Sequence, residues 1–313
     1  MALTKCCKAT SKSSPRRSRQ KSVARRSNPA GCDARRSAVT LAELLRTTAG
    51  YLAEKGVDSP RVDAELLLSR ALGLSRIELY TQHDRPLNAD EISAAREFVR
   101  RRAAREPLAY ILGDWGFRRL ILKTDARALV PRPETEILVD RALALLADVE
   151  SPRIVDVGTG SGAIALALKD ELPAATVTAV DLSPDALALA SENAAALDLA
   201  VAFVESDLLG AVEGPFDLIA SNPPYVDDDE APGLPPEVRD HEPKLAVFGH
   251  GETERLADAA RAKLVSGGAL VLECHEAKTD QIAATLTALG YDDVRVTNDL
   301  AGRARVVEGR WTP

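Results

Sequence analysis

The chain has 313 residues, a length that predicts two folded domains, and its 45% hydrophobic and 28% charged content is ordinary for a globular protein. No stretch approaches ~18 consecutive apolar residues, so no membrane-spanning helix and no membrane partner are predicted. The net charge of −7 is unevenly distributed: residues 1–36 hold eleven Lys or Arg and one acidic residue, and the remainder carries a net charge of −17. A body this acidic is poorly suited to sequence-independent nucleic-acid binding and better suited to a basic protein partner.

Residues 1–37 form a basic tail that we expect to be disordered, because they contain almost no large apolar residues. Three of the four cysteines lie in this tail, and no zinc spacing or disulfide framework is present, so we expect no metal and a reducing, cytoplasmic location. An Arg- and Ser-rich tail also describes an organelle transit peptide, which would make the protein mitochondrial or otherwise organellar. An RNA- or ribosome-contacting arm is a third interpretation, and composition leaves all three open.

Residues 38–106 are predicted to form a small helical domain. Thr40, with Glu43 three residues later, matches a capping box, as do residues 88–91. Pro60 can open a helix between them. Five arginines on the last helical stretch indicate either a solvated face or a contact for a partner or RNA: Arg96, Arg100, Arg101, Arg102 and Arg105.

Residues 107–133 are predicted to form short strands in a β-hairpin linker. Across residues 134–313, strands alternate with helices, which indicates an α/β fold with a parallel sheet covered on both faces. Strands are expected near 153–157, 176–181, 201–205, 216–220 and 269–273, and helices from 134, at 161–171 and at 184–197. The end of the chain is predicted to form a closing hairpin around Gly302.

A glycine-rich turn follows the first of these strands. Small residues let the backbone turn sharply and lie against a ligand at the start of the next helix. The second strand ends in Asp181, whose carboxylate can accept hydrogen bonds from both hydroxyls of a ribose. The candidate residues for a nucleoside-containing cofactor are therefore Gly158, Thr159, Gly160, Ser161, Gly162 and Asp181.

This pattern alone does not identify the nucleoside. Gly158, Gly160 and Ala163 also satisfy the fingerprint of NAD-binding proteins. Asp156, two residues before the first glycine, favours a cationic amino-acid ligand and would repel a pyrophosphate. Asp207 follows the third strand, where it can reach the edge of a base or serve only as a turn residue.

The fourth strand leads into Asn222-Pro223-Pro224-Tyr225, the most specific signal in the chain. Ligands of open parallel sheets bind beyond the carboxyl ends of the strands. The Asn222 side chain and the Pro223 backbone each supply a carbonyl acceptor, and two acceptors can hold both hydrogens of an –NH₂ group. The Tyr225 ring can lie against a planar group or a developing positive charge. We therefore predict that Asn222, Pro223 and Tyr225 are catalytic and that all four residues bind the substrate.

Such a site suits methylation of a planar amide or amine nitrogen. An amide nitrogen is a poor nucleophile because its lone pair is delocalised, so hydrogen bonds that favour tetrahedral geometry, with alignment against a sulfonium methyl, would assist transfer. The predicted cofactor is S-adenosyl-L-methionine.

These motifs resemble those of a known family. Residues 154–225 are similar to class I methyltransferases, and Asn-Pro-Pro-Tyr to their amino- and amide-methylating branch. Pro-Leu-Ala-Tyr-Ile-Leu-Gly at 107–113 and Leu-Val-Pro-Arg-Pro-Glu-Thr-Glu at 129–136 resemble the protein-(glutamine-N5) methyltransferases of peptide chain release factors. The same family is indicated by Val238-Arg239, Glu242-Pro243 and Ala246.

The resemblance covers about residues 38–310 and implies a Rossmann-like class I methyltransferase sheet behind the helical domain. It implies methylation of the glutamine side-chain nitrogen in the Gly-Gly-Gln motif of release factors. The helical domain would recognise the release factor. Asn222 would also contact the cofactor, and the adenine would lie near Asp207 and Leu208. Some members carry Trp where this chain has Leu208.

Three other functions remain open from the residues alone. A DNA adenine-N6 methyltransferase uses the same tetrapeptide, but it needs a basic target-recognition region that the acidic body does not show. A non-enzymatic module would leave the pairing of the glycine-rich turn with residues 222–225 unexplained. An NAD-dependent oxidoreductase is disfavoured by Asp156. We expect a monomer that makes no sequence-specific contact with nucleic acid.

Overall fold

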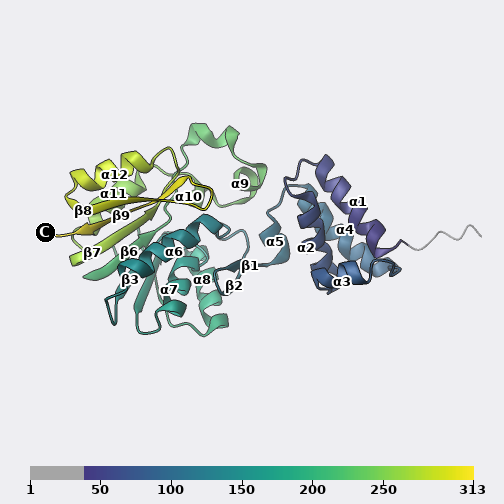
Figure 1. Ribbon diagram of the computed structural model, residues 1–313, viewed down its shortest axis with the longest axis horizontal. Helices are drawn as coiled ribbons and strands as arrows, with labels where there is room; N and C mark the ends of the chain where they lie inside the picture. The colour runs from purple at the N-terminus through teal and green to yellow at the C-terminus, as the bar shows by residue number, and fades with distance from the viewer. Residues whose placement is uncertain (1–38) are drawn as a thin grey trace, which may run out of the picture. The chain divides into compact units, whose positions relative to one another are not determined.

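The computed structural model describes residues 39–313, so the expectations for residues 1–37 lie outside the described residues. Within this range no helix is both long enough and apolar enough to cross a bilayer. The helices and strands are labelled in Figure 1. The helical region comprises α1 (Leu41–Glu54), α2 (Pro60–Leu72), α3 (Arg76–Thr81), α4 (Ala89–Ala103) and α5 (Leu108–Leu112).

The helix starts in this region follow the capping signals. The side chains of Thr40 and Asn88 accept from the backbone N–H three residues later, and both capping boxes are complete. Pro60 is the first residue of α2, as predicted. The helix α3 was not predicted, although Ser75 and Glu78 form a third capping box at its start.

The arginines of α4 are engaged within the chain. The Arg102 side chain is buried and its Nε donates to Asp63 at 2.6 Å. Arg102 and Arg105 also pair with Glu237, a residue distant in sequence, each at 2.7 Å. The stretch is therefore not simply a solvated basic face, and much of its charge is unavailable for nucleic acid.

The predicted hairpin is present but shorter than its segment. β1 (Asp114–Phe117) and β2 (Leu120–Lys123) pair antiparallel. Residues 108–112 form the helix α5 instead of a strand. This helix ends where Gly113 adopts a left-handed conformation with φ of 80°.

The rest of the chain forms a seven-stranded sheet in the order β5-β4-β3-β6-β7-β9-β8. The first five strands in this order run parallel, and β9 is antiparallel to both of its neighbours. The strands are β3 (Arg153–Val157), β4 (Thr176–Asp181), β5 (Ala202–Glu205), β6 (Phe216–Ser221), β7 (Leu264–Glu273), β8 (Tyr291–Asn298) and β9 (Ala304–Trp311). The predicted α/β sheet and its closing hairpin are confirmed.

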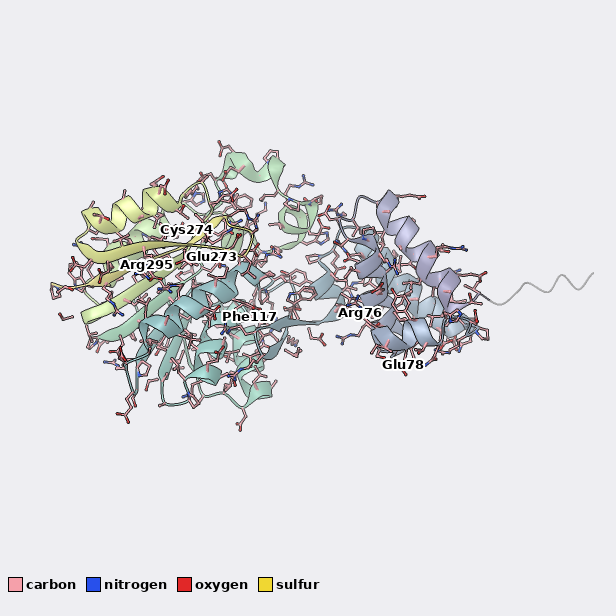
Figure 2. The ribbon with its side chains drawn as sticks, in the orientation of Figure 1. Arg76, Glu78, Phe117, Glu273, Cys274 and Arg295 are labelled. Carbon is pink, nitrogen blue, oxygen red and sulfur yellow. The ribbon has the colours of Figure 1, made fainter. Side chains whose placement is uncertain are left out.

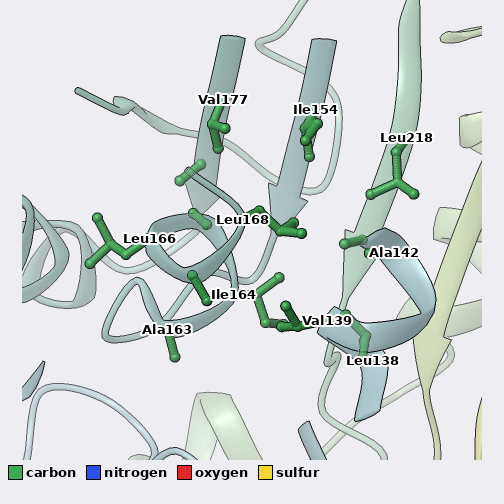
Figure 3. Close-up of a cluster of buried hydrophobic side chains, with 14 of the residues drawn as sticks. Leu138, Val139, Ala142, Ile154, Ala163, Ile164, Leu166, Leu168, Val177 and Leu218 are labelled. Carbon is green, nitrogen blue, oxygen red and sulfur yellow. The ribbon is translucent and has the colours of Figure 1, made fainter. Parts of the chain in front are cut away.

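Helices cover both faces of the sheet. On one face, α6 (Pro133–Leu145) and α7 (Ala163–Glu171) pack against β3, β4 and β6 through the apolar cluster drawn in Figure 3. On the other, α11 (Glu252–Ala260) and α12 (Thr279–Ala288) bury Leu256, Ile282 and Leu286 against the sheet. α8 (Pro184–Leu197) follows β4. Because both faces are covered, most residues of the central strands β3 and β6 are buried.

The strand order brings the two predicted motifs together. β3 and β6 are neighbours in the sheet, and their last residues, Val157 and Ser221, are paired in register. The order of the chain reverses between these two strands, which is where open α/β sheets bind ligands. The glycine-rich turn and the Asn222 tetrapeptide therefore leave the same edge of the sheet side by side.

The segment between β6 and β7 contains short helices that were not predicted. These are η1 (Asp228–Gly233), α9 (Pro236–His241) and α10 (Lys244–Val247). They are too short and too rich in proline to carry a helical period in the sequence.

Candidate active site

The glycine-rich turn has backbone angles that require glycine. Gly158, Gly160 and Gly162 have φ of 72°, 57° and 85°. A Cβ on Gly162 would lie 3.0 Å from Leu166 and 3.2 Å from Ala190, so this glycine also allows close packing beneath the turn. Its left-handed conformation delays α7, which begins at residue 163 and not at 161 as predicted.

Asp156 supports this turn from inside the protein. It has no exposed surface, and its Oδ2 accepts from the Thr159 hydroxyl at 2.6 Å and from the Ala165 N–H at 3.1 Å. Burial raises the pKa of Asp156 to about 7. Because Asp156 is fully buried, it cannot contact a ligand directly and can act on one only through its charge. Thr159 and Ser161 are buried too, and the Thr159 hydroxyl is already engaged with Asp156.

Asp181 is held in place by the backbone of both neighbouring turns. Its Oδ2 accepts from the Gly160 N–H at 2.8 Å and its Oδ1 from the Ser183 N–H at 2.9 Å. Each carboxylate oxygen retains a further acceptor position, so the group is oriented and can still bind hydroxyls. A cavity of about 450 Å³ opens beside Ser183 and is lined by Asp125, Ala126, Arg127, Ser183, Asp185 and Pro243.

The residues predicted to lie near the adenine follow the adjacent strand. The Ser206 N–H donates to the Asp181 carbonyl, which places Asp207 and Leu208 at the same sheet edge. The Asp207 carboxylate is exposed and pairs with Arg255 at 2.9 Å, and Leu208 is partly buried against the core. Sequence reasoning missed Leu182, an apolar residue that is 51% exposed directly after Asp181. The signal in the sequence was an apolar residue directly after the acidic end of a strand.

The tetrapeptide begins where β6 ends. The Ser221 hydroxyl donates to the Val157 carbonyl at 2.7 Å, which ties this end of β6 to β3. The Asn222 Nδ2 donates to the Thr135 hydroxyl at 3.2 Å. Because the amide hydrogens turn toward Thr135, Oδ1 is the atom that Asn222 can present to a substrate.

Contacts from distant segments hold the tetrapeptide in place. Val226 forms a bridge to Phe248, and at Gly249 a Cβ would lie only 2.0 Å from the Pro224 carbonyl oxygen. From the other side, the Lys278 Nζ donates to the Tyr225 carbonyl at 2.7 Å. Sequence reasoning missed Gly249 and Lys278, because no local motif marks a residue that contacts another segment.

Tyr225 and Glu273 complete the site. Burial, together with the nearby Glu273 carboxylate, raises the pKa of Tyr225 to about 12, so its phenol stays neutral. Glu273, labelled in Figure 2, is the last residue of β7 and is buried, whereas Tyr225 is partly buried. The sequence analysis did not identify Glu273, since a glutamate at the end of an apolar strand carries no specific pattern.

Comparison with known proteins identifies the family. The chain matches the model of the PrmC N-terminal domain over residues 43–113 and that of the methyltransferase small domain over residues 135–233. The release factor glutamine methyltransferase of Deinococcus radiodurans is 47% identical over 276 residues, which cover 86% of this chain and 98% of that protein. This chain belongs to the release factor glutamine methyltransferase family.

Other members of the release factor glutamine methyltransferase family match over a similar extent. That of Chlorobaculum tepidum is 43% identical, covering 83% of this chain and 93% of its own, and that of Geobacter sulfurreducens is 40% identical, covering 87% and 96%. The family resemblance and the class I methyltransferase fold inferred from the motifs are therefore confirmed. Nothing in the comparisons favours the DNA adenine-N6 methyltransferase alternative.

Proposed function

We propose that this protein transfers a methyl group from S-adenosyl-L-methionine to the side-chain amide nitrogen, N5, of the glutamine in the Gly-Gly-Gln motif of peptide chain release factors. The observation that carries the proposal is the in-register pairing of Val157 with Ser221. It sets the glycine-rich turn, which we propose binds the nucleoside, beside residues 222–225, which we propose bind the amide, at one edge of the sheet. Family membership supplies the substrate class.

The cofactor would be held by the ends of β3, β4 and β5. The backbone of residues 158–162 would lie against its amino-acid part, and Asp181 would accept from its ribose hydroxyls. Asp207, Leu208 and the exposed Leu182 would surround the base, and Asn222 would reach the reacting end. The bound cofactor would supply an electrophilic methyl group on a sulfonium. The charge of Asp156, when ionised, favours a cationic ligand.

The substrate amide would be held by Asn222–Tyr225. The Asn222 Oδ1 and the Pro223 carbonyl would accept the two hydrogens of the glutamine –NH₂ group, which fixes the nitrogen and draws its lone pair toward the methyl. The Pro224 and Tyr225 rings would confine the planar amide, and the neutral Tyr225 ring suits the positive charge that develops on nitrogen. These groups orient the nucleophile and need no covalent intermediate.

We propose that the helical region, α1 to α5, recognises the release factor. Residues 43–113 match a domain model of this family, and α4 contacts the segment between β6 and β7 through Arg105 and Glu237. The acidic body suits a basic protein surface. Cytoplasmic location, the monomeric state and the absence of nucleic-acid contacts stay predictions.

The proposal is tested by single-turnover transfer from labelled S-adenosylmethionine to purified release factor. A release factor with Gln→Ala in its Gly-Gly-Gln motif is the matched control, and duplex DNA tests the alternative. We expect label on the unmodified release factor only. Equal labelling of the Gln→Ala control, or labelling of DNA, would overturn the substrate assignment.

A further inference from the structure

Four charged residues join the helical region to the segment between β6 and β7. Asp63 lies on α2, Arg102 on α4, Arg105 just after α4, and Glu237 on α9. The Arg105 Nε and Nη2 donate to the two carboxylate oxygens of Glu237 at 2.8 and 2.7 Å. The Arg102 guanidinium bridges the two acids, because its Nη1 lies 2.7 Å from the Glu237 Oε1 and its Nε donates to Asp63 at 2.6 Å. These four residues are termed the ion-pair cluster.

The ion-pair cluster is largely shielded from water. The side chains of Arg102 and Asp63 are 8% and 9% exposed, and those of Glu237 and Arg105 are 16% and 19% exposed. Shielded charges attract one another more strongly than surface charges, and a two-point contact between arginine and a carboxylate fixes both distance and angle. Buried ion pairs add little net stability relative to apolar packing, so the contribution of this cluster is its defined geometry.

Among residues 39–313, no apolar cluster spans this contact. The two clusters of the helical region contain only residues between 41 and 112, and α9 has no buried residue. A further polar contact lies beside the ion-pair cluster, where the His241 Nε2 is 3.2 Å from the Ala104 carbonyl oxygen. The position of α9 against the helical region therefore depends on polar contacts, and the ion-pair cluster supplies most of them.

The other end of the segment is fixed to the part of the chain that forms the active site. Glu242, directly after α9, is buried and accepts from the Arg132 Nη2 at 2.6 Å. Phe248 forms a bridge to Val226, the residue that follows the tetrapeptide. Glu242 and Phe248 thus hold the segment beside residues 222–225, while Glu237 reaches the helical region. The segment therefore connects the helical region to the tetrapeptide.

We propose that Arg102, Arg105 and Glu237 are positioning residues, which hold the helical region at a fixed place relative to the tetrapeptide. A release factor docked on the helical region would then present its Gly-Gly-Gln loop at residues 222–225. This inference rests on the proposed function. A protein substrate that contacts two surfaces of one enzyme benefits from the second contact only when their separation matches its own. The ion-pair cluster thus favours an intact release factor over a short peptide with the same motif.

Glu237→Gln tests the ion-pair cluster, and Asp240→Asn is the matched control. Glutamine keeps the size of glutamate and removes its charge. Asp240 lies on the same helix but pairs with its neighbour Arg239 at the surface. We expect Glu237→Gln to lower kcat/KM for intact release factor about 10-fold or more, because the two contacts lose their fixed separation. For a short Gly-Gly-Gln peptide, which does not reach the helical region, kcat/KM should change less than about 3-fold.

Asp240→Asn should match the wild type with both substrates, and S-adenosylmethionine affinity should be unchanged in both variants. A wild-type value for Glu237→Gln with intact release factor would overturn the proposal. Equal losses with factor and peptide would also overturn it, because a merely structural defect in the site acts on both. Wild-type enzyme that methylates the peptide as efficiently as the intact factor would contradict the preference.

Arg105→Gln removes the partner on the opposite side of the contact. It should also lower kcat/KM for the intact release factor and spare the peptide. In the double variant with Glu237→Gln, the loss should be well below the product of the two single losses, because both changes break the same contact. Losses that multiply would show that the two residues act independently and would overturn the pairing.

Hydrogen exchange distinguishes failure of this inference from failure of the proposed function. In Glu237→Gln the backbone amides of α9 should exchange about 10-fold faster, because the helix loses its contact with the helical region. The Gly249 N–H, which donates to the Val226 carbonyl at 3.0 Å, should keep its protection. If the wild-type protein labels neither substrate, the proposed function fails while exchange still tests the cluster. Unchanged exchange in α9 would overturn the inference whatever the substrate is.

Discussion

Asp181 connects the cofactor site to the backbone of two turns. Because Gly160 and Ser183 already orient its carboxylate, Asp181→Ala removes a preorganised acceptor. We expect S-adenosylmethionine binding to weaken by ~2 kcal/mol or more, as for the loss of hydrogen bonds to a charged group. Calorimetric titration measures this change. Asp185→Ala alters an exposed acid that lines the cavity beside Ser183 and serves as the control, with affinity near wild type. Unchanged affinity in Asp181→Ala would remove this residue from the site.

Asn222 is the residue on which the proposed chemistry depends. Asn222→Ala should lower kcat by on the order of 10²-fold or more, comparable with the loss of one transition-state hydrogen bond. Cofactor affinity should fall less, because the glycine-rich turn and Asp181 remain. Tyr225→Ala should slow transfer more mildly through loss of the ring, and Tyr225→Phe should be close to wild type. Transfer by Asn222→Ala at the wild-type rate would show that the tetrapeptide is only a turn.

At the scale of the elements, the position of the tetrapeptide depends on the segment that precedes α11. A Cβ at Gly249 would lie 2.0 Å from the oxygen and 2.6 Å from the carbon of the Pro224 carbonyl, so Gly249→Ala must displace one of the two backbones. We expect a loss of transfer rate approaching 10²-fold, as for a misplacement of about 1 Å, with cofactor affinity retained. Gly233→Ala, in the same segment, meets nothing within 4 Å and is the matched control. Similar rates in the two variants would contradict this support.

The elements that carry their own signals could be predicted from the sequence. The bounds of β3, β4 and α8 agree with those expected, since turn residues bound each of these segments. The short helices of the segment from η1 to α10 could not be predicted, because contacts such as that of Glu237 with Arg105 position them. The same reason applies to the site. The glycine-rich turn and residues 222–225 are local motifs, whereas Thr135 acts on a residue 87 positions away.

For the whole molecule, buried carboxylates set how stability depends on pH. Burial raises the pKa of both Asp156 and Glu273 to about 7, above the ordinary value of ~4. The folded state then binds protons more tightly than the unfolded state. The stability associated with these groups is fully present below pH ~4 and is lost as pH rises through about 7.

We therefore expect the free energy of unfolding to fall between pH 5 and 8, by on the order of 3 kcal/mol for each fully desolvated group. Asp156→Asn should reduce this fall, because the asparagine does not titrate. Urea titrations at several pH values measure both proteins. The same slope in the wild type and Asp156→Asn would show that Asp156 does not contribute.

The position of β9 has a consequence for the synthesis of the protein. β9 follows every other strand in the chain, yet it lies inside the sheet, between β7 and β8. While the chain is being made, β7 can therefore pair only with β6, and β8 lacks its neighbour in the sheet, until residues 304–311 have left the ribosome. Pairing of this kind is distant in sequence and slow to form, and until it forms β7 exposes an apolar edge to other nascent chains. The sheet can thus be completed only after β9 has been made, and this last step of its assembly is the stage at which chaperones would be most needed.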